Sequence, residues 1–277
     1  MGGGRQAPST VGRPVAGPRE SPRATAVRLN ARVVNWAGMY DCYGDVDRVP
    51  DLLARVERED DAEVWRELGH RLVLEGDMVF AASFVALPAL VRLASRSAWA
   101  RRLAGEIVRC AAGAHGCDDL LAGCAGAVAR FRELLDAHLR SRPDAYLPAF
   151  CDLLAADGQY HWSAVLGDFS DDFYGVACPQ CAVAVTIAIG DHGRYSAIRD
   201  WHLGDVDRRD LRPAAPEDLS GTGRWMYGTA VRDGQSVLAD GIAHLFGRAE
   251  CPPCGAVFGV ADEYAAAHRS STDPWAA

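Results

Sequence analysis

Long hydrophobic runs are absent from this sequence of 277 residues. No stretch approaches the ~18–20 consecutive apolar residues that a membrane-crossing helix needs, so no membrane association is expected. Residues 1–5 are not followed by an apolar core, which argues against a secretory signal. Gln6 stands where a myristoylation motif has serine or threonine. These absences predict a cytoplasmic protein.

The short motifs of several common enzyme classes are also absent. The sequence contains no HExxH, no GxSxG, no Walker loop and no GxGxxG. Its net charge of −8 opposes non-specific binding to nucleic acid, because such binding depends on neutralising phosphates. The composition therefore argues against a nucleic-acid partner and leaves open whether the chain is an enzyme.

The N-terminal segment differs in composition from the rest of the chain. Residues 1–25 are rich in glycine, proline, serine and arginine, with almost no large apolar side chain. Such a segment cannot bury enough apolar surface to offset its chain entropy, so a disordered tail is predicted over residues 1–25. Beyond it, Trp36, Met39, Tyr40 and Tyr43 recur at helical spacing and predict one core-facing side of a short amphipathic helix, with a binding surface as the alternative.

Three segments, residues 49–53, 87–91 and 147–151, share an apolar-Pro-x-apolar-apolar pattern. Proline is tolerated in the first turn of a helix, so each segment is predicted to begin a helix. Apolar stripes with helical period lie between these segments. They are Val64, Trp65, Leu68 and Leu72; Trp99, Leu103 and Cys110; and Val128, Phe131, Leu134, Leu135 and Leu139. The pattern predicts a HEAT-like helical repeat domain over residues 26–158, with a non-repeat helical bundle as the alternative.

A further set of motifs lies within residues 34–94. It comprises Val-Asn-Trp at 34–36, Tyr-Gly at 43–44, Val-Pro-Asp-Leu-Leu at 49–53 and Ala-Ala-Ser-Phe-Val-Ala-Leu-Pro-Ala-Leu at 81–90. This set resembles a widespread group of bacterial HEAT-repeat proteins of largely unknown function. Many of those proteins carry a His-Gln-Gly element where this chain has Leu74-Glu75-Gly76. The resemblance implies an α-solenoid with a concave surface suited to a partner.

The pattern changes after Pro148. Residues 182–189 and 256–260 are β-prone, residues 203–224 predict a loop, and residues 231–246 predict an amphipathic helix with Val237, Ile242 and Leu245 as apolar positions. A small α+β domain resembling a zinc ribbon is therefore predicted over residues 159–277. No Gly/Ser- or Pro-rich linker separates the two halves, which favours one fused unit over independent domains.

Two CxxC pairs carry the strongest chemical signal. They are Cys178-Pro179-Gln180-Cys181 and Cys251-Pro252-Pro253-Cys254. A two-residue spacing lets both thiolates of a pair point inward from a tight turn, and two such turns complete the Cys₄ tetrahedron that Zn²⁺ prefers. One structural zinc ion is predicted, with residues 182–250 as an insertion between the two knuckles. Four thiolates leave no position for an activated water, so the metal is expected to stabilise the fold. A redox role for one pair is the alternative.

The other five cysteines are expected to behave as small buried apolar residues. They are Cys42, Cys110, Cys117, Cys124 and Cys151. The even spacing of Cys110, Cys117 and Cys124 could suggest a second metal site. Gly113 and Gly116 lie between the first two, however, and argue against one continuous helix.

Histidines and aspartates of the second half are candidates for catalysis. They are His161, His192, His202, Asp168, Asp171 and Asp172. A histidine supported by a carboxylate is the arrangement of a general base. The preferred hypothesis is nevertheless a zinc-stabilised binding or scaffold protein that acts on a protein partner, as an immunity protein or a pathway accessory. The alternative is a biosynthetic enzyme whose pocket lies between the helical and zinc-ribbon domains and uses these residues. The sequence specifies neither the partner, nor the substrate, nor the oligomeric state.

Overall fold

The computed structural model describes residues 26–29, 32–36, 38–44, 46–76, 78–113, 117–167, 173–190, 193–198 and 207–271. Within these residues the chain is mostly helical, with eleven helices and small antiparallel sheets, so the predicted mainly helical class is confirmed. The predicted tail, residues 1–25, lies outside the described residues. No helix in the described part is long and apolar enough to cross a membrane.

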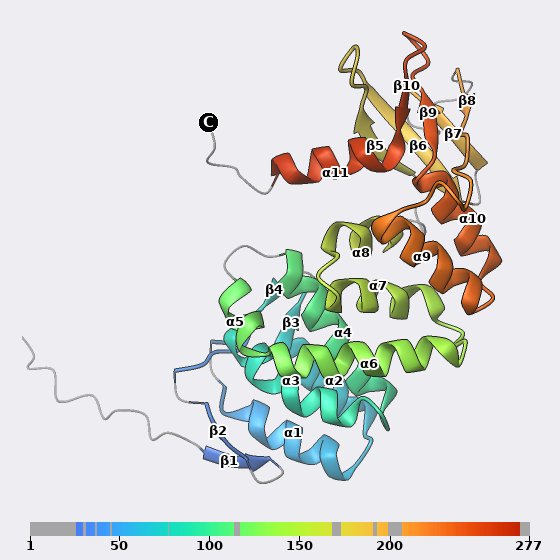
Figure 1. Ribbon diagram of the computed structural model, residues 1–277. Coiled ribbons are helices and arrows are strands. Elements are labelled where there is room, and N and C mark those ends of the chain that lie inside the picture. Colours follow the sequence, from blue (N-terminus) through green and yellow to red (C-terminus); the bar gives the residue numbers. More distant parts are fainter. Residues whose placement is uncertain are drawn as a thin grey trace, which may run out of the picture.

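Eight of the described helices lie between residues 48 and 167. They are α1 (Arg48–Arg58), α2 (Ala62–Leu72), α3 (Ala81–Leu93), α4 (Ala98–Gly113), α5 (Asp118–Gly123), α6 (Ala125–Arg140), α7 (Tyr146–Ala156) and α8 (Tyr160–Gly167). Consecutive helices pack in pairs: α1 on α2, α3 on α4, and α6 on α7. The pairs also stack, because α3 contacts α1 and α6 while α4 contacts α2 and α7. These contacts place the helices in two layers, α1–α3–α6 and α2–α4–α7. The helices of both layers lie in the lower half of Figure 1.

The predicted apolar stripes account for much of this packing. All four stripe residues of α2 are buried, and Asp61 caps the start of that helix by accepting a hydrogen bond from the Glu63 backbone N–H at 2.8 Å. On α6, Phe131, Leu135 and Leu139 are fully buried. The stripe of α4 is only partly a core stripe, because Trp99 at its start is 39 % exposed.

Proline occupies different places in the three predicted helix starts. Pro50 and Pro148 lie in the first turns of α1 and α7, as predicted. Pro88 lies inside α3, so the prediction that residues 87–91 begin a helix is wrong. Proline offers no N–H to the carbonyl of Phe84, four residues earlier. The thiol of Cys124, beside the start of α6, donates to that carbonyl at 3.2 Å, which lets α3 continue through Pro88.

The three proline motifs also occupy non-equivalent positions in the stack. The helices of the first two, α1 and α3, lie in one layer, whereas α7, which carries the third, lies in the other. The repeated proline motif therefore does not mark equivalent helices of a structural repeat.

The described residues between 36 and 44 form turns and irregular chain rather than a helix, so the predicted short helix is wrong. Gly38 and Gly44 have φ angles of +78° and +86°, which a right-handed helix cannot accommodate. Trp36 is buried, but Tyr40 and Tyr43 are 53 % and 66 % exposed. The aromatic residues therefore do not share one buried face.

Strands gather in the C-terminal part of the chain. β5 (Phe173–Ala177), β6 (Ala184–Gly190), β7 (Gly193–Ala197) and β8 (Arg209–Asp210) form one antiparallel sheet in that order. β9 (Arg248–Glu250) and β10 (Val257–Gly259) form a hairpin, which a bridge between Arg212 and Arg248 joins to the chain beyond β8. β6 and β10 confirm the two predicted β-prone runs. Two short hairpins lie earlier: β1 (Ala26–Leu29) with β2 (Arg32–Asn35), and β3 (Val73–Leu74) with β4 (Met78–Val79).

Three helices complete the C-terminal part. They are α9 (Gly221–Arg232), α10 (Ser236–Leu245) and α11 (Val260–Ser271). Residues 231–246 were expected to form one helix, but Gly234, with φ of +74°, separates α9 from α10. The break exposes 77 % of Val237, a predicted core position. The start of α9 also corrects the predicted loop, which ends at Ser220 rather than at Arg224.

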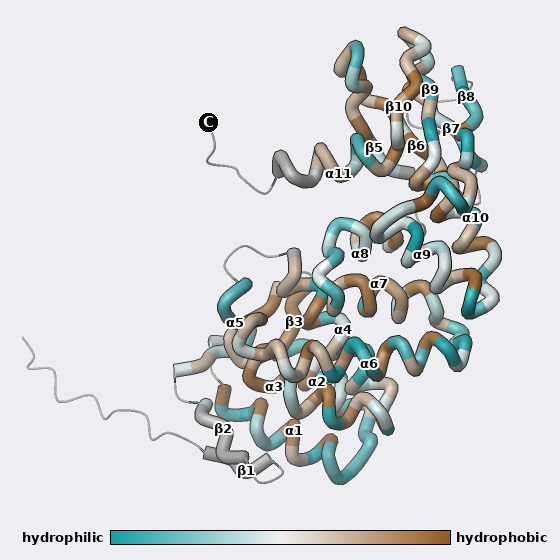
Figure 2. Tube along the Cα trace, in the orientation of Figure 1, coloured by the Kyte–Doolittle hydropathy of each residue, from teal (hydrophilic) through white to brown (hydrophobic). Residues whose placement is uncertain are grey.

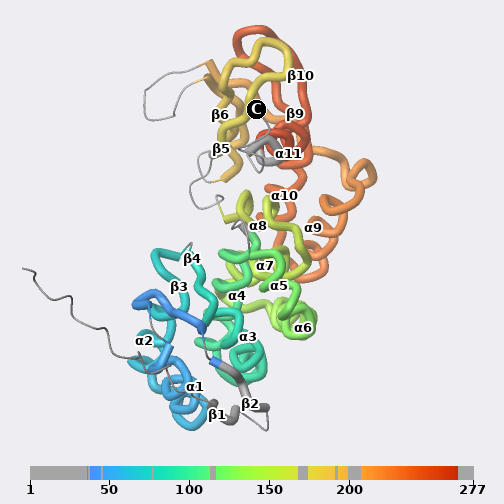
Figure 3. Tube along the Cα trace, turned by 90° about the vertical axis from the view of Figure 1, so that its left-hand side faces the viewer, coloured from blue at the N-terminus to red at the C-terminus, as the bar shows by residue number. Residues whose placement is uncertain are grey.

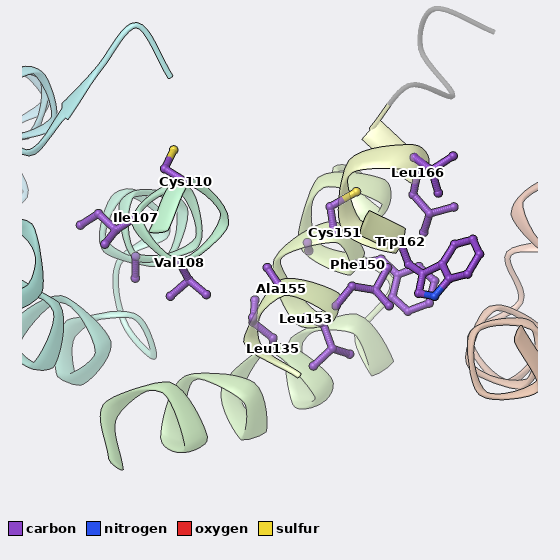
Figure 4. Packing of buried hydrophobic residues seen from close by; sticks show 14 of the residues in the cluster. Ile107, Val108, Cys110, Leu135, Phe150, Cys151, Leu153, Ala155, Trp162 and Leu166 are labelled. Carbon is purple, nitrogen blue, oxygen red and sulfur yellow. The ribbon is translucent and has the colours of Figure 1, made fainter. Parts of the chain in front are cut away.

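A single hydrophobic core runs from the helical layers into the C-terminal part. Figure 2 shows hydrophobic residues along α7, and Figure 4 shows buried side chains of α4, α6, α7 and α8. Aromatic rings join the two parts: Phe150 lies 5.7 Å from Trp225 of α9, and Trp162 lies 4.8 Å from Phe246, between ring centres. Figure 3 shows α7, α8 and α9 between the lower helices and the strands. These contacts favour a fused unit, while the division into domains at residues 26–158 and 159–277 stays a prediction.

Candidate metal centre

The two CxxC pairs occupy equivalent positions at the tips of two β-hairpins. Cys178 and Cys181 lie between β5 and β6, and Cys251 and Cys254 lie between β9 and β10. Both hairpin tips stand at the upper end of the molecule in Figure 1. Each hairpin thus supplies two thiols from one tight turn, as the CxxC spacing predicts.

The backbone of the two turns follows the same pattern. In the first turn, the N–H of Cys178 donates to Val183 and the N–H of Ala182 donates to Cys178, both at 2.9 Å. In the second turn, the N–H of Cys251 donates to Ala256 and that of Gly255 donates to Cys251, both at 2.8 Å.

The residue after each second cysteine has a left-handed conformation. Its φ is +58° at Ala182 and +72° at Gly255. Glycine adopts this conformation without strain, whereas alanine does so at a cost. The same conformation occurs at the matching position of both turns, and the first turn retains it at a cost at Ala182, which indicates that the turn geometry serves the thiols it presents.

The four sulfurs converge to distances that suit one metal ion. All four lie within 4.8 Å of one another, and the Sγ–Sγ distance is 3.7 Å both for Cys178 with Cys254 and for Cys181 with Cys251. A tetrahedral site with metal–sulfur bonds of ~2.3 Å separates neighbouring sulfurs by about 3.8 Å. The close pairs join one turn to the other, so the set is a four-thiol cluster that could hold a metal ion.

The two turns present their cysteines in the same way. The first cysteine of each turn, Cys178 or Cys251, is buried, and the second, Cys181 or Cys254, is exposed. Burial raises the pKa of the Cys251 thiol to about 12. Burial acts in the same direction on Cys178, but hydrogen bonds from the backbone of Cys181 and Gln180 outweigh it and lower the pKa to about 7. The backbone thus favours the thiolate, the metal-binding form, at Cys178.

Tertiary structure revises the expected insertion between the knuckles. Within residues 182–250, β6 and β9 are strands of the two hairpins that carry the cysteine turns. β7 and β8 extend the sheet to which β6 belongs. The Ser196 hydroxyl on β7 donates to the carbonyl of Glu250 on β9 at 2.6 Å, which ties the sheet to the second hairpin. Among the described residues of this segment, α9, α10 and their flanking loops extend beyond this β structure.

The remaining cysteines do not form a second cluster among the described residues. Cys110 and Cys151 are buried, as predicted, whereas Cys42, Cys117 and Cys124 are half-buried. The thiol of Cys42 donates to the carbonyl of His70 at 2.8 Å, and that of Cys110 donates to the carbonyl of Gly76 at 3.0 Å. These cysteines therefore join backbone segments in the way that small polar side chains do.

Most of the predicted catalytic set cannot be placed. His192, His202, Asp168, Asp171 and Asp172 lie outside the described residues. His161, on α8, is described and lines a polar pocket of about 410 Å³ together with Asp218 and Asp262. Ser220 and Thr222, at the start of α9, belong to the same pocket. Neither aspartate was singled out by the sequence, because nothing local marks them as neighbours of His161.

A second surface lies on α2. Two adjoining hollows of about 350 Å³ and 280 Å³ share Arg66 and His70 in their lining, with Trp99 in the first and Tyr43 in the second. We call these four residues the α2 surface. The Arg71 guanidinium lies 4.9 Å from the Tyr43 ring centre and pairs with the buried Asp41 carboxylate at 2.5 Å, which positions the tyrosine.

Comparisons with protein-family models, with curated proteins and with solved structures found no match to this chain. The functional argument therefore rests on the chain's own residues.

Proposed function

We propose that this chain is a zinc-stabilised binding protein whose helical part holds a protein partner. The observation that supports the metal is the convergence of four thiols at 3.7 Å spacing. Four sulfur ligands in a tetrahedral set favour Zn²⁺, and they leave no open position for a reacting water. The zinc ion, held by Cys178, Cys181, Cys251 and Cys254, therefore acts as a fold-stabilising link between the two hairpins.

The repeat assignment is part of this proposal. Three helix pairs stacked in two layers suit a short HEAT-like array, with residues 26–158 as the repeat domain and residues 159–277 as the zinc-ribbon-like domain. In such an array the inner layer faces a concave side, and α2, α4 and α7 would form that layer. We also place the protein in the cytoplasm, because a reducing compartment suits nine free thiols.

The α2 surface supports a protein partner. Tyr43 and Trp99 are 66 % and 39 % exposed, and Arg66 lines both hollows. Tyrosine, tryptophan and arginine are the residues that most often dominate binding energy at protein interfaces. All 29 basic residues of the chain are arginine, the cation enriched at such interfaces, whereas lysine is depleted there.

The experiment is affinity capture of the full chain from extracts of its source organism, followed by size-exclusion chromatography of the complex. The proposal expects one partner at fixed stoichiometry, and substitution of Tyr43→Ala with Trp99→Ala weakens the complex at least tenfold. Val231→Ala with Val237→Ala truncates two exposed apolar side chains on α9 and α10, 52 % and 77 % exposed, and serves as the control. A complex of unchanged affinity in the Tyr43/Trp99 variant would contradict the proposal.

A second candidate function is an enzyme that uses the polar pocket at His161. The observation in its favour is that His161 of α8, Asp218 of the turn before α9 and Asp262 of α11 line one pocket. Such residues could act as general acid and base. The test is incubation of the full chain with a metabolite extract and mass spectrometry of the products, with His161→Gln compared against His138→Gln on α6. Turnover that persists in His161→Gln would exclude this candidate.

A further inference from the structure

A third pocket, distinct from the metal centre and the α2 surface, opens between α4, α7 and α8. Its volume is about 440 Å³, within the range of small-molecule sites. Arg109 of α4 lines it, with Leu147, Pro148 and Cys151 of α7 and Tyr160, Ser163, Ala164 and Gly167 of α8. We call this the α8 pocket.

The walls of the α8 pocket are largely apolar. Leu147, Pro148 and Ala164 present carbon atoms, and the Ser163 hydroxyl already donates to the carbonyl of Cys151 at 2.8 Å. Ala164 and Gly167 are exposed and carry no side chain large enough to fill the mouth. The pocket therefore offers apolar contact area to a ligand and few hydrogen bonds along its length.

Among the described lining residues of the α8 pocket, Arg109 is the one charged side chain, and a contact outside the pocket holds its position. Its Nη1 pairs with the carboxylate of Asp152, a residue of α7 that is 6 % exposed. Asp152 in turn lies directly against Gly105 of α4, where a Cβ atom would come within 2.2 Å of the carboxylate. Glycine at this position lets the carboxylate reach Arg109, so α4 and α7 together orient the guanidinium.

The orientation of Arg109 leaves donors for a ligand. A guanidinium carries five N–H donors in a planar fork, and the contact with Asp152 engages Nη1. The Arg109 side chain is 36 % exposed, so it is accessible from the pocket. Asp152 neutralises part of the charge of Arg109, so the guanidinium attracts an anion only weakly. Its role is therefore to orient an anionic group of the ligand, while contact with the apolar walls supplies most of the affinity.

We propose that the α8 pocket binds a small apolar molecule with one carboxylate, such as an aliphatic or aromatic acid. The carboxylate accepts hydrogen bonds from Arg109, and the apolar body lies against Leu147, Pro148 and Ala164. This assignment is independent of the proposed partner and of the zinc ion.

The test uses octanoate and neutral octanol as competitors of the fluorescent anion 1-anilinonaphthalene-8-sulfonate on the full, natively folded chain. The fluorophore is expected to bind one saturable site, and octanoate to displace it about tenfold more effectively than octanol, as expected for the loss of a charge-assisted hydrogen bond. Ala164→Trp fills the mouth of the pocket from an exposed position and abolishes saturable binding. Ala129→Trp, at an exposed position on α6, is the matched control and leaves it unchanged.

Arg109→Lys provides a second readout, because lysine keeps the charge beside Asp152 but loses the planar fork. Octanoate is expected to lose about tenfold in affinity while octanol is unaffected. The α8 pocket would not be the binding site if the Ala164→Trp variant still bound the fluorophore. The same conclusion would follow if the wild type showed no fluorophore binding at millimolar concentration. Equal displacement by octanoate and octanol would overturn the anionic class of ligand.

Discussion

The hydroxyl of Tyr146 donates a 2.8 Å hydrogen bond to Oδ2 of Asp233, although 87 positions separate the two residues. Tyr146 begins α7, and Asp233 follows the last residue of α9. The Arg232 guanidinium binds both carboxylate oxygens of Asp233, at 2.7 and 2.8 Å, and also binds Asp136 of α6 at 3.0 Å. This network links the helical layers to the C-terminal part, with Tyr146 and Asp233 buried and Arg232 and Asp136 partly exposed.

Removal of the Tyr146 hydroxyl tests that link. In Tyr146→Phe, the buried Asp233 loses one hydrogen bond and keeps its pairing with Arg232. We expect the free energy of unfolding, measured in urea, to fall by about 1.5–3 kcal/mol, as for a hydrogen bond to a charged group. Tyr43→Phe, at an exposed position, is the control and should change it little. An equal effect of the two substitutions would show that the Tyr146–Asp233 bond contributes nothing to stability.

The pH dependence of stability follows from the same network. Arg232 hydrogen-bonds the ionised Asp233, with a further bond from Tyr146, and together these hold the pKa of the carboxyl below its ordinary value. The native state therefore favours the ionised form. Its contribution is present above the unfolded pKa of ~3.9 and is lost as the pH falls through the lower folded-state pKa.

Asp233→Asn should accordingly be less stable than the wild type at pH 7, and the difference in unfolding free energy should narrow below about pH 4. Urea unfolding at a series of pH values measures this difference. Asp210→Asn, at an exposed carboxylate, controls for the loss of one charge. If the difference in unfolding free energy between Asp233→Asn and the wild type stayed constant down to the lowest pH measured, the pKa of Asp233 would not be lowered in the native state.

Metal content is the third prediction. Elemental analysis should find about one zinc ion per chain, and Cys178→Ser or Cys254→Ser should lose both the metal and much of its stabilisation. Cys117→Ser, outside the cluster, should keep both. After removal of zinc with a chelator, Cys254→Ser should melt at nearly the same temperature as the wild type, because its side chain is exposed. A metal-free wild type of unchanged melting temperature would argue against a structural metal.

The fourth prediction concerns Pro88 and Cys124. In Cys124→Ala, the Phe84 carbonyl loses its thiol donor and has no N–H from Pro88 to replace it. In the background of Pro88→Ala, the restored N–H can donate to that carbonyl, so Cys124→Ala should cost less. A double-mutant cycle measured by urea unfolding should give a coupling of about 0.5–1 kcal/mol. Additive effects would mean that the thiol does not substitute for the missing donor.

Local patterns were sufficient to predict the four-cysteine cluster and several helices. The CxxC spacing places two thiols in one turn by local geometry alone, so all four cysteines of the cluster could be identified before the fold was known. The stripe of α2 and the first-turn prolines of α1 and α7 were predictable for the same reason. Each of these features depends on residues a few positions apart.

The sequence-based predictions failed where contacts between distant parts of the chain determine the structure. Pro88 lies inside α3, where the thiol of Cys124, from a distant segment, donates a hydrogen bond to the Phe84 carbonyl. The pocket neighbours of His161, namely Asp218 and Asp262, come from loops and helices more than fifty positions away. Spacing along the chain by itself determined the thiol turns and the amphipathic helices. Only tertiary packing decided how the helix pairs stack and which polar residues meet, because those contacts depend on long-range geometry that no local period encodes.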